Sequence, residues 1–200
     1  MLGDQANIKI CVSGAAETEH CGDGAMEKAT ALGKAIAENG CILTEGATTG
    51  FPYWSAKAAK EAGGIVIGFS PAATESEHLN EYKLPLDYRD LIVYTGFGYS
   101  GRNLILTRAS DAVIVGCGRI GTINEFTVAF EDSKPIGILK AVWETDEVFE
   151  QIIQKSHRAD EMKDRIVIEE DPKVLVEKII EVVKKTREES GASDAKHNTK

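Results

Sequence analysis

The chain has 200 residues, of which 42% are hydrophobic and 28% charged, so its composition is that of a globular protein and excludes a disordered one. Asp and Glu number 32 against 23 Lys and Arg, and the formal net charge is −9. Nucleic acids and anionic membranes need a basic surface, so neither is expected as a partner. No apolar run approaches the roughly 18 residues of a membrane span, and no basic leader precedes an apolar stretch. A cytoplasmic location is therefore expected.

Short apolar runs alternate with longer amphipathic segments along the chain. The short runs are continuously apolar, which is typical of strands covered on both faces. Strands are predicted over Ile8–Ser13, Cys41–Glu45, Ile65–Phe69, Leu91–Tyr94, Ala112–Val115, Pro135–Leu139 and Arg165–Ile168. Helices are predicted over Ala25–Asn39, Tyr53–Ala62, Gly101–Ser110, Ile123–Asp132, Asp146–Lys155 and Pro172–Arg187. This order predicts a doubly wound α/β fold, with a mostly parallel, Rossmann-like sheet of about seven strands and helices on both faces.

The elements make one domain over residues 1–188, since about 200 residues usually form a single domain. The last helix has a good start, because Asp171 can cap it and Pro172 suits its first position. Residues 189–200 are polar and are expected to form a disordered tail. The segment Ser70–Asp90 is long and irregular, which indicates a lid or a partner-facing loop.

Cysteines and histidines are few and show no metal-binding spacing. Cys11 and Cys41 lie in apolar runs and are interpreted as small core residues. No two cysteines are spaced as C-x-x-C, so a zinc site is not expected. A disulfide is expected even less in a reducing compartment. His20, His78 and His157 are interpreted as solvated surface residues.

The loop after the second strand, Glu45–Pro52, is the first candidate for ligand binding. Its two glycines and two threonines open a helix, an arrangement that lets backbone N–H groups approach a phosphate. The Gly-Lys-Ser/Thr ending of a Walker P-loop is missing. The alternative is a tight turn with a threonine cap.

The loop after the fifth strand contains G-x-G-x-x-G, from Gly116 to Gly121. A nicotinamide dinucleotide site also needs an acidic residue about 20 positions further on, and residues 139–141 supply none, so a dehydrogenase is disfavoured. Thr122 and Glu125 have the spacing of a capping box. The alternative is functional, because a carboxylate at the end of a strand can activate water or stabilise an oxocarbenium ion.

A third loop, Tyr94–Asn103, follows the fourth strand and is rich in glycine and aromatic residues. Arg102 stands near a helix start, where a guanidinium can bind a phosphate or carboxylate through two hydrogen bonds. Taken alone, Arg102 is better explained as an ordinary surface arginine, because most arginines lie at the surface.

Taken together, these motifs resemble the LONELY GUY family, long labelled lysine decarboxylases. Arg102, Asp111 and the segment Gly121-Thr122-x-x-Glu125 stand at the spacing of that family, whose signature is P-G-G-x-G-T-x-x-E. The resemblance covers roughly residues 8–140. The Glu45–Pro52 loop is more similar to that of uncharacterised bacterial and archaeal homologues and of molybdenum-cofactor carrier proteins.

The resemblance implies a Rossmann-like fold, a homodimer or dimer of dimers, and a nucleotide site at the carboxyl ends of the strands. Characterised members hydrolyse the N-glycosidic bond of nucleoside 5′-monophosphates, and the carry-over makes Arg102 and Glu125 the catalytic residues. With the glycine-rich loops included, the expected phosphate-binding residues are Ser13, Gly14, Gly46, Thr48, Thr49, Gly50, Gly118, Arg119, Gly121 and Thr122. No metal and no cofactor are expected.

The sequence departs from the family pattern at four places. Cys117 replaces the proline of the signature and Arg119 its second glycine. Asn103 replaces the lysine that follows the arginine, and Glu45-Gly46-Ala47 replaces the triple-glycine loop. Glycine adopts a positive φ at little cost and arginine does not, so Arg119 removes that conformation and adds bulk beside the phosphate. Its guanidinium is in turn a candidate for a phosphate contact. Two functions follow: a nucleoside 5′-monophosphate N-glycosidase, or a carrier or sensor of a nucleotide or pterin-phosphate ligand such as molybdenum cofactor. Lysine decarboxylation is disfavoured, because the three loops hold no lysine for a Schiff base with pyridoxal phosphate.

Overall fold

The computed structural model describes residues 8–197, with side chains described as far as Glu189. Seven parallel strands form one sheet in the order β4-β3-β2-β1-β5-β6-β7, which confirms the predicted doubly wound fold. The strands are β1 (Lys9–Ser13), β2 (Ile42–Glu45), β3 (Ile65–Ser70), β4 (Leu91–Tyr94), β5 (Ala112–Val115), β6 (Ile136–Leu139) and β7 (Ile166–Glu169). All seven lie where the apolar runs predict strands, within a residue or two at each end.

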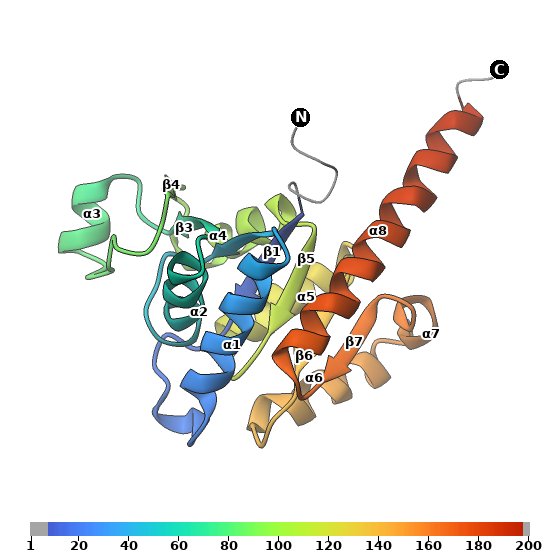
Figure 1. Cartoon of the computed structure of the whole chain (residues 1–200), viewed down its shortest axis with the longest axis horizontal. Helices are drawn as coiled ribbons and strands as arrows, with labels where there is room; N and C mark the ends of the chain where they lie inside the picture. The colour runs from blue at the N-terminus through green and yellow to red at the C-terminus, as the bar shows by residue number, and fades with distance from the viewer. Residues whose placement is uncertain (1–7, 198–200) are drawn as a thin grey trace.

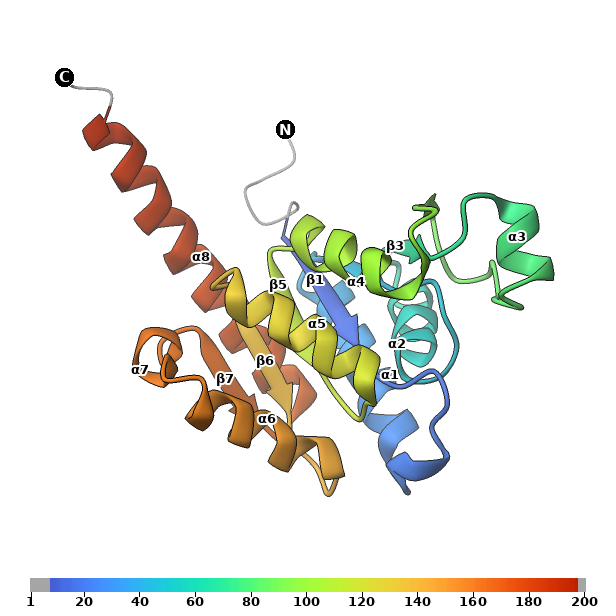
Figure 2. The ribbon, with the colours of Figure 1, turned by 180° about the vertical axis from the view of Figure 1, so that it is seen from behind.

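Helices cover both faces of the sheet. They are α1 (Ala25–Glu38), α2 (Gly50–Glu61), α3 (Glu75–Asn80), α4 (Gly98–Ala109), α5 (Ile120–Glu131), α6 (Glu144–Lys155), α7 (Ala159–Met162) and α8 (Pro172–His197), with a short 3-10 helix, η1 (Glu19–Cys21), after β1. Helices α1, α2 and α8 lie on one face (Figure 1), and α4, α5 and α6 lie on the other (Figure 2).

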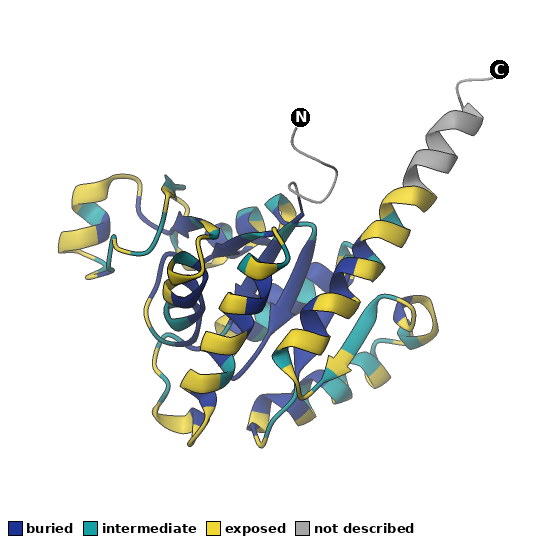
Figure 3. Cartoon of the chain, in the orientation of Figure 1, coloured by how far each residue is buried: buried dark blue, intermediate teal, exposed yellow. Residues whose placement is uncertain are grey.

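Alternate residues of each central strand feed two separate cores. In β1, Ile10 and Val12 pack under α1, α2 and α8, whereas Cys11 faces the opposite core around Phe126 and Phe149. Both faces of β1 and β5 are therefore buried (Figure 3), which explains why these strands are continuously apolar in sequence.

Strands β1 and β5 are neighbours, and from them the sheet is built outward in opposite directions. The loops that follow the two strands diverge at this switch point, and a crevice opens at the carboxyl ends of the strands. The site described below lies in this crevice.

Several helices begin earlier than predicted, because the glycine-rich loops form their first turns. Helix α2 begins at Gly50, α4 at Gly98 and α5 at Ile120, each three residues before the predicted start. The start of α8 is confirmed, since Asp171 Oδ1 accepts hydrogen bonds from the backbone N–H groups of Lys173 and Val174 at 2.8 and 3.0 Å. The ligand loops are thus helix N-termini.

The segment Ser70–Asp90 is not irregular throughout, because it contains α3, which stands out from the body of the molecule (Figure 1). Its His78 is fully buried, so the surface assignment of this histidine is wrong. The imidazole bonds Ser70 Oγ at 2.8 Å and the Pro85 carbonyl oxygen at 3.1 Å, and it thereby ties the two ends of the segment together. His20 and His157 are exposed, as expected.

The last helix, α8, runs ten residues past the predicted end, to His197. The expected tail at 189–200 lies almost wholly outside the residues with described side chains and stays a prediction, as does the single domain over 1–188. None of the described helices is both long and apolar enough to cross a bilayer.

Candidate functional site

A cavity of about 730 Å³ opens at the carboxyl ends of β1, β2 and β5. Its walls come from the loops after these strands, from the first turns of α4 and α5, and from residues 82–84 of the long segment after β3. Nine of the predicted site residues line it, namely Gly14, Gly46, Thr48, Thr49, Arg102, Arg119, Gly121, Thr122 and Glu125. The other three, Ser13, Gly50 and Gly118, do not line it but are each next in sequence to a residue that does.

Glu125 lies at the floor of the cavity and has a partner on each carboxylate oxygen. Oε1 accepts a hydrogen bond from Arg102 Nη1 at 3.2 Å, and Oε2 accepts a short one from Ser13 Oγ at the end of β1. Only 8% of the Glu125 side chain is exposed. Burial raises the pKa of Glu125, while the charge of Arg102 and the bond from Ser13 oppose that rise.

The capping-box interpretation of Glu125 is wrong. Helix α5 has Arg119 at its N-cap and no side-chain cap, so Thr122 lies inside the first turn. The Glu125 carboxylate points away from the helix start, toward Ser13 and Arg102. A buried carboxylate with a raised pKa, beside a specific cation in a cavity, is typical of a functional group.

Arg102 is buried but has unused hydrogen-bonding capacity. Its guanidinium lies over the Tyr99 ring, 5.9 Å from the centroid, and bonds Glu125 through Nη1. Its Nε is buried and has no partner among the described residues. A buried donor left unpaired costs about 1–3 kcal/mol, so Arg102 is a candidate for binding an acceptor from outside the described part of the chain.

Gly46 provides the space that Arg102 occupies. A Cβ added at Gly46 would lie 1.8 Å from Arg102 Nη1. The glycine of the second loop is thus required by a side chain from α4, and not only by the turn.

Asn103, beside Arg102, adds a further polar contact to the same carboxylate. With its amide nitrogen turned toward α5, Asn103 donates to Glu125 Oε1 and to the Tyr99 carbonyl oxygen, both at 3.0 Å. The residue that replaces the family's lysine therefore supports Glu125 with a neutral donor.

A second buried ion pair, between Glu45 and Arg89, was missed by the sequence analysis. Arg89 Nε and Nη2 donate to the two Glu45 oxygens at 2.8 and 3.2 Å, and neither side chain is exposed. The remaining Arg89 donors reach the carbonyl oxygens of Thr48, Pro85 and Asp87 at 2.8 to 3.1 Å. The pair fixes the loop after β2 to the segment that carries α3. An acidic residue at the end of an apolar strand was the only signal available.

The loop after β2 is also held to the loop after β1. Thr49 Oγ1 donates to the Ala16 carbonyl oxygen at 3.0 Å, and Phe51 N–H donates to the Ala15 carbonyl oxygen at 2.9 Å. Gly50 has φ +69°, and a Cβ there would lie 2.3 Å from the Ala15 oxygen. This close approach requires glycine.

The signature loop after β5 is fixed in a different way. Arg119 points outward, and its Nη1 donates to the exposed Glu17 carboxylate at 2.7 Å.

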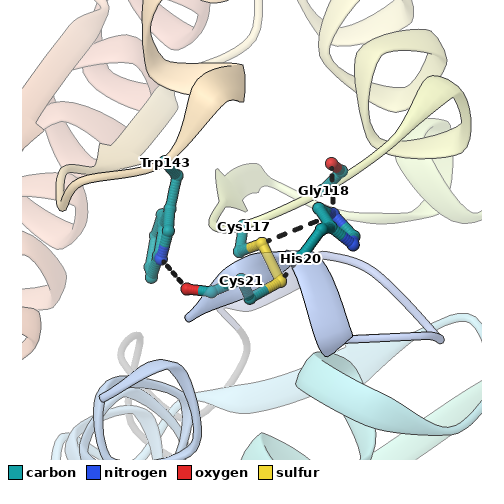
Figure 4. Close-up of a disulfide and its surroundings, with 5 residues drawn as sticks. All are labelled: His20, Cys21, Cys117, Gly118 and Trp143. Carbon is teal, nitrogen blue, oxygen red and sulfur yellow. Dashed lines mark hydrogen bonds between the residues drawn. A yellow bond between two sulfur atoms is a disulfide. The ribbon is translucent and has the colours of Figure 1, made fainter. Parts of the chain in front are cut away.

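Cys117 is joined to Cys21 by a disulfide, so the expectation of no disulfide is wrong (Figure 4). The two cysteines are 96 residues apart in sequence, but the loops after β1 and β5 are neighbours because the two strands pair. Cys11 and Cys41 are free and buried, as expected.

Lys83 also lines the cavity, although the three loops contain no lysine. It comes from the segment after α3, and its φ of +57° places it in the left-handed region. Residues 82–84 of this segment line the cavity, and the interpretation of Ser70–Asp90 as a lid or a partner-facing loop stays a prediction.

Comparisons with known proteins agree with the resemblance seen in the motifs. An uncharacterised protein of Archaeoglobus fulgidus is 34% identical over 133 residues, which are 66% of this chain and 80% of the relative. The molybdenum cofactor carrier protein of Chlamydomonas reinhardtii is 28% identical, with 90% of this chain and 97% of that one aligned at a TM-score of 0.66. The molybdenum cofactor binding protein of Rippkaea orientalis is 26% identical, with 90% and 96% aligned at 0.63.

The match to a described family spans most of the chain, from residue 7 to residue 176, and so includes every strand and the whole cavity. It supports the LONELY GUY-like, Rossmann-fold assignment near the molybdenum-cofactor carrier group. The chain belongs to the SLOG cluster4 family.

Proposed function

We propose that this protein binds a nucleoside 5′-monophosphate and hydrolyses its N-glycosidic bond, releasing the base and ribose 5-phosphate. The observation that carries the proposal is the buried Glu125 carboxylate at the floor of the cavity, held by Ser13 and by an arginine with a donor to spare. A protein that only binds phosphate needs N–H groups and cations, and it has no evident need for a carboxylate at that point.

In this proposal the phosphate binds at the N-termini of α2 and α5. Both helices are 12 residues long, and their first turns lie at the cavity wall, so their dipoles favour an anion. In α2 the Phe51 N–H already donates to the Ala15 carbonyl oxygen and Pro52 has no N–H, so the first turn of α5 is the main source of N–H donors. The ligand reaches from these helix ends to Arg102, and the guanidinium is its second contact. These local features make anion binding possible in a chain with a net charge of −9.

The chemistry assigned to Glu125 follows from its position. Water adds to C1′ of the ribose while the bond from C1′ to the base nitrogen breaks, and the base leaves with that electron pair and a proton. Positive charge develops on the ribose during this step, and the Glu125 carboxylate stabilises it or takes the proton of the attacking water. Ser13, Arg102 and Asn103 hold the carboxylate in place before the substrate reacts.

A second candidate is a carrier or sensor that binds a pterin-phosphate ligand without chemistry. It is favoured by the 28% identity to the molybdenum cofactor carrier protein of Chlamydomonas reinhardtii across 90% of this chain. It is also consistent with Glu125, since both carboxylate oxygens already have partners. Both candidates use the same phosphate contacts and differ only in whether a bond breaks.

The test is a panel of purine and pyrimidine nucleoside 5′-monophosphates, incubated with the full chain and analysed for free base and ribose 5-phosphate. The matching nucleosides, which lack the phosphate, are the controls. We expect release from at least one monophosphate and none from its nucleoside. Folded protein that releases nothing from any member of the panel would contradict hydrolysis and leave the carrier function.

The homodimer implied by the family resemblance is part of this proposal. Phe97 and Leu104 of the α4 region are exposed apolar side chains, at 69% and 39% exposure, and so is Ile120 of α5, which lines the cavity, at 79%. Light scattering of the full chain checks the association, with twice the monomer mass of 21.6 kDa as the expected result.

A further inference from the structure

Three potential metal ligands lie together on the outer side of the signature loop. Cys21 of η1 and Cys117 after β5 are buried and joined by the disulfide, and His20 lies over it (Figure 4). His20 Nε2 is 3.7 Å from Cys117 Sγ and 3.9 Å from Cys21 Sγ. All three ligand atoms lie within 4.8 Å of one another.

We propose that His20, Cys21 and Cys117 form a redox-gated site for a zinc-like divalent cation. With the disulfide reduced, two thiolates and one imidazole bind the cation, and the fourth position is open to water. Formation of the disulfide removes both thiolates and expels the cation. This site is separate from the cavity, and the inference does not depend on the function proposed for the cavity.

The geometry is close to that of a bound zinc ion. Zn–S bonds of about 2.3 Å and Zn–N bonds of about 2.0–2.1 Å in a tetrahedron place the nitrogen roughly 3.5 Å from each sulfur. The imidazole nitrogen already lies 3.7 and 3.9 Å from the two sulfurs. In the same geometry the two sulfurs have to separate to roughly 3.8 Å, and the exposed imidazole has to turn its nitrogen toward the cation.

Contacts other than the disulfide hold the three residues in place after reduction. Trp143 Nε1 donates to the Cys21 carbonyl oxygen at 3.0 Å, and Ala15 N–H donates to the Cys117 carbonyl oxygen at 2.8 Å. His20 Nε2 lies 3.2 Å from the Gly118 carbonyl oxygen, and its exposed ring can turn this nitrogen to a metal and carry the proton on Nδ1. The reduced site is therefore largely formed before a cation arrives.

The site links two loops that line the cavity. Ala15, Ala16 and Glu17 precede the site in one loop, and Arg119 follows Cys117 in the other. The disulfide and the bound cation both cross-link these loops, whereas the reduced, metal-free state leaves them joined only by hydrogen bonds and by the exposed Arg119–Glu17 pair.

The redox step balances with ordinary thiol–disulfide exchange. Two molecules of a low-molecular-weight thiol reduce the Cys21–Cys117 bond to two thiols and leave as one disulfide. The two protein thiols lose their protons when they bind the cation. In the reverse direction a low-molecular-weight disulfide accepts two electrons from the thiolates, takes up two protons from the solvent and leaves as two thiols, and the cation is released.

The experiment uses the full chain without a histidine tag. One sample is reduced with a phosphine under anaerobic conditions and another is oxidised with a low-molecular-weight disulfide. Each is incubated with Zn²⁺, desalted and analysed for zinc, and thiols are counted after denaturation. We expect one zinc per reduced chain with four thiols, and none per oxidised chain with two. Equal zinc content in the two states would overturn the proposal.

Variants test the ligand set. His20→Ala changes an exposed residue and should weaken zinc binding by the reduced chain at least about tenfold, and Cys117→Ser should abolish it. Cys41→Ser, which alters a buried cysteine outside the cluster, is the matched control and should bind zinc like the reduced parent chain. Co²⁺ bound to the reduced chain should show a thiolate charge-transfer band that is lost in Cys117→Ser. Unchanged affinity in His20→Ala, or no charge-transfer band in the reduced parent chain, would overturn the site.

Discussion

Two buried arginine–carboxylate pairs lie at the carboxyl edge of this sheet, and they differ in how completely they are satisfied. Arg89 uses all five of its N–H groups, two on Glu45 and three on carbonyl oxygens, and neither side chain of the pair is exposed. Arg102 makes a single bond to Glu125 at 3.2 Å, keeps a buried Nε without a partner among the described residues, and faces the cavity. We propose that the complete pair stabilises the fold and that the incomplete pair is where a ligand binds.

This difference matters because a buried ion pair is by itself weak evidence of function. Removing one partner of a complete pair leaves an uncompensated buried charge and costs about 3–5 kcal/mol of stability. An incomplete pair has already given up part of that stabilisation, which a ligand can restore on binding. Four predictions follow, in decreasing order of the expected effect.

Glu125→Gln tests the incomplete pair, Arg102–Glu125, through its proposed chemistry. The amide keeps the shape of the side chain but can neither accept a proton from water nor stabilise positive charge, so we expect turnover to fall about 10³-fold. Ribose 5-phosphate release is the measurement, with Glu131→Gln as the control, since Glu131 is on the same helix and pairs with Arg158 at the surface. Equal turnover in Glu125→Gln and the parent protein would show that Glu125 has no part in the reaction.

Arg89→Lys tests the complete pair, Arg89–Glu45, through the free energy of unfolding. Lysine keeps the charge but cannot donate to Glu45, Thr48, Pro85 and Asp87 together, so we expect a loss of about 3 kcal/mol in the free energy of unfolding. Urea denaturation measures it. Arg108→Lys, which alters an exposed pair with Asp132, should cost under about 1 kcal/mol. Similar losses in the two variants would refute the scaffold role of Arg89.

Gly46 follows Glu45 of the complete pair in sequence and lies against Arg102 of the incomplete pair. Gly46→Ala adds a methyl group where Arg102 Nη1 lies. The guanidinium is the flexible end of a side chain and can move, so we expect little loss of stability. Phosphate-ligand affinity, measured by calorimetry, should fall about tenfold because Arg102 is displaced. Unchanged affinity would mean that the position of Arg102 is not what the ligand requires.

The pH dependence of stability is the smallest expected effect. Burial holds the pKa of Glu125 above its usual value of 4.5, so the folded protein keeps this proton at a pH where the unfolded chain has lost it. The contribution of this group to the free energy of unfolding therefore falls as pH rises from about 4.5 through the raised pKa. Urea denaturation across this range should show the fall in the parent protein and not in Glu125→Gln. Parallel curves would contradict the raised pKa.

Sequence alone predicted the scaffold and much of the cavity wall, because both depend on local pattern. Continuous apolar runs mark strands buried on both faces, and glycine-rich loops after strands mark the ligand edge. The choice of Arg102 and Glu125 as site residues came from the spacing of a family motif, whereas their ion pair was not predicted. Contacts that depend on the tertiary arrangement were missed.

Arg89 is 44 residues from Glu45, and Cys21 is 96 residues from Cys117. Nothing local marks either pairing, since each forms only when the parallel sheet brings distant loops to one edge. His78 was misassigned for the same reason: its partners are the two ends of a segment that folds back on itself. Helix starts were placed late because glycines usually interrupt helices, whereas here they open them.

The most direct test of the incomplete pair is calorimetric titration of ribose 5-phosphate into the parent protein and into Arg102→Lys. Lysine retains the charge at this position but loses the free guanidinium donors, and Glu125 keeps a cationic neighbour. We predict one site per chain in the parent protein and an affinity at least tenfold lower in Arg102→Lys, with both proteins equally folded. Equal affinity in the two would contradict the claim that the unused donors of Arg102 receive the ligand.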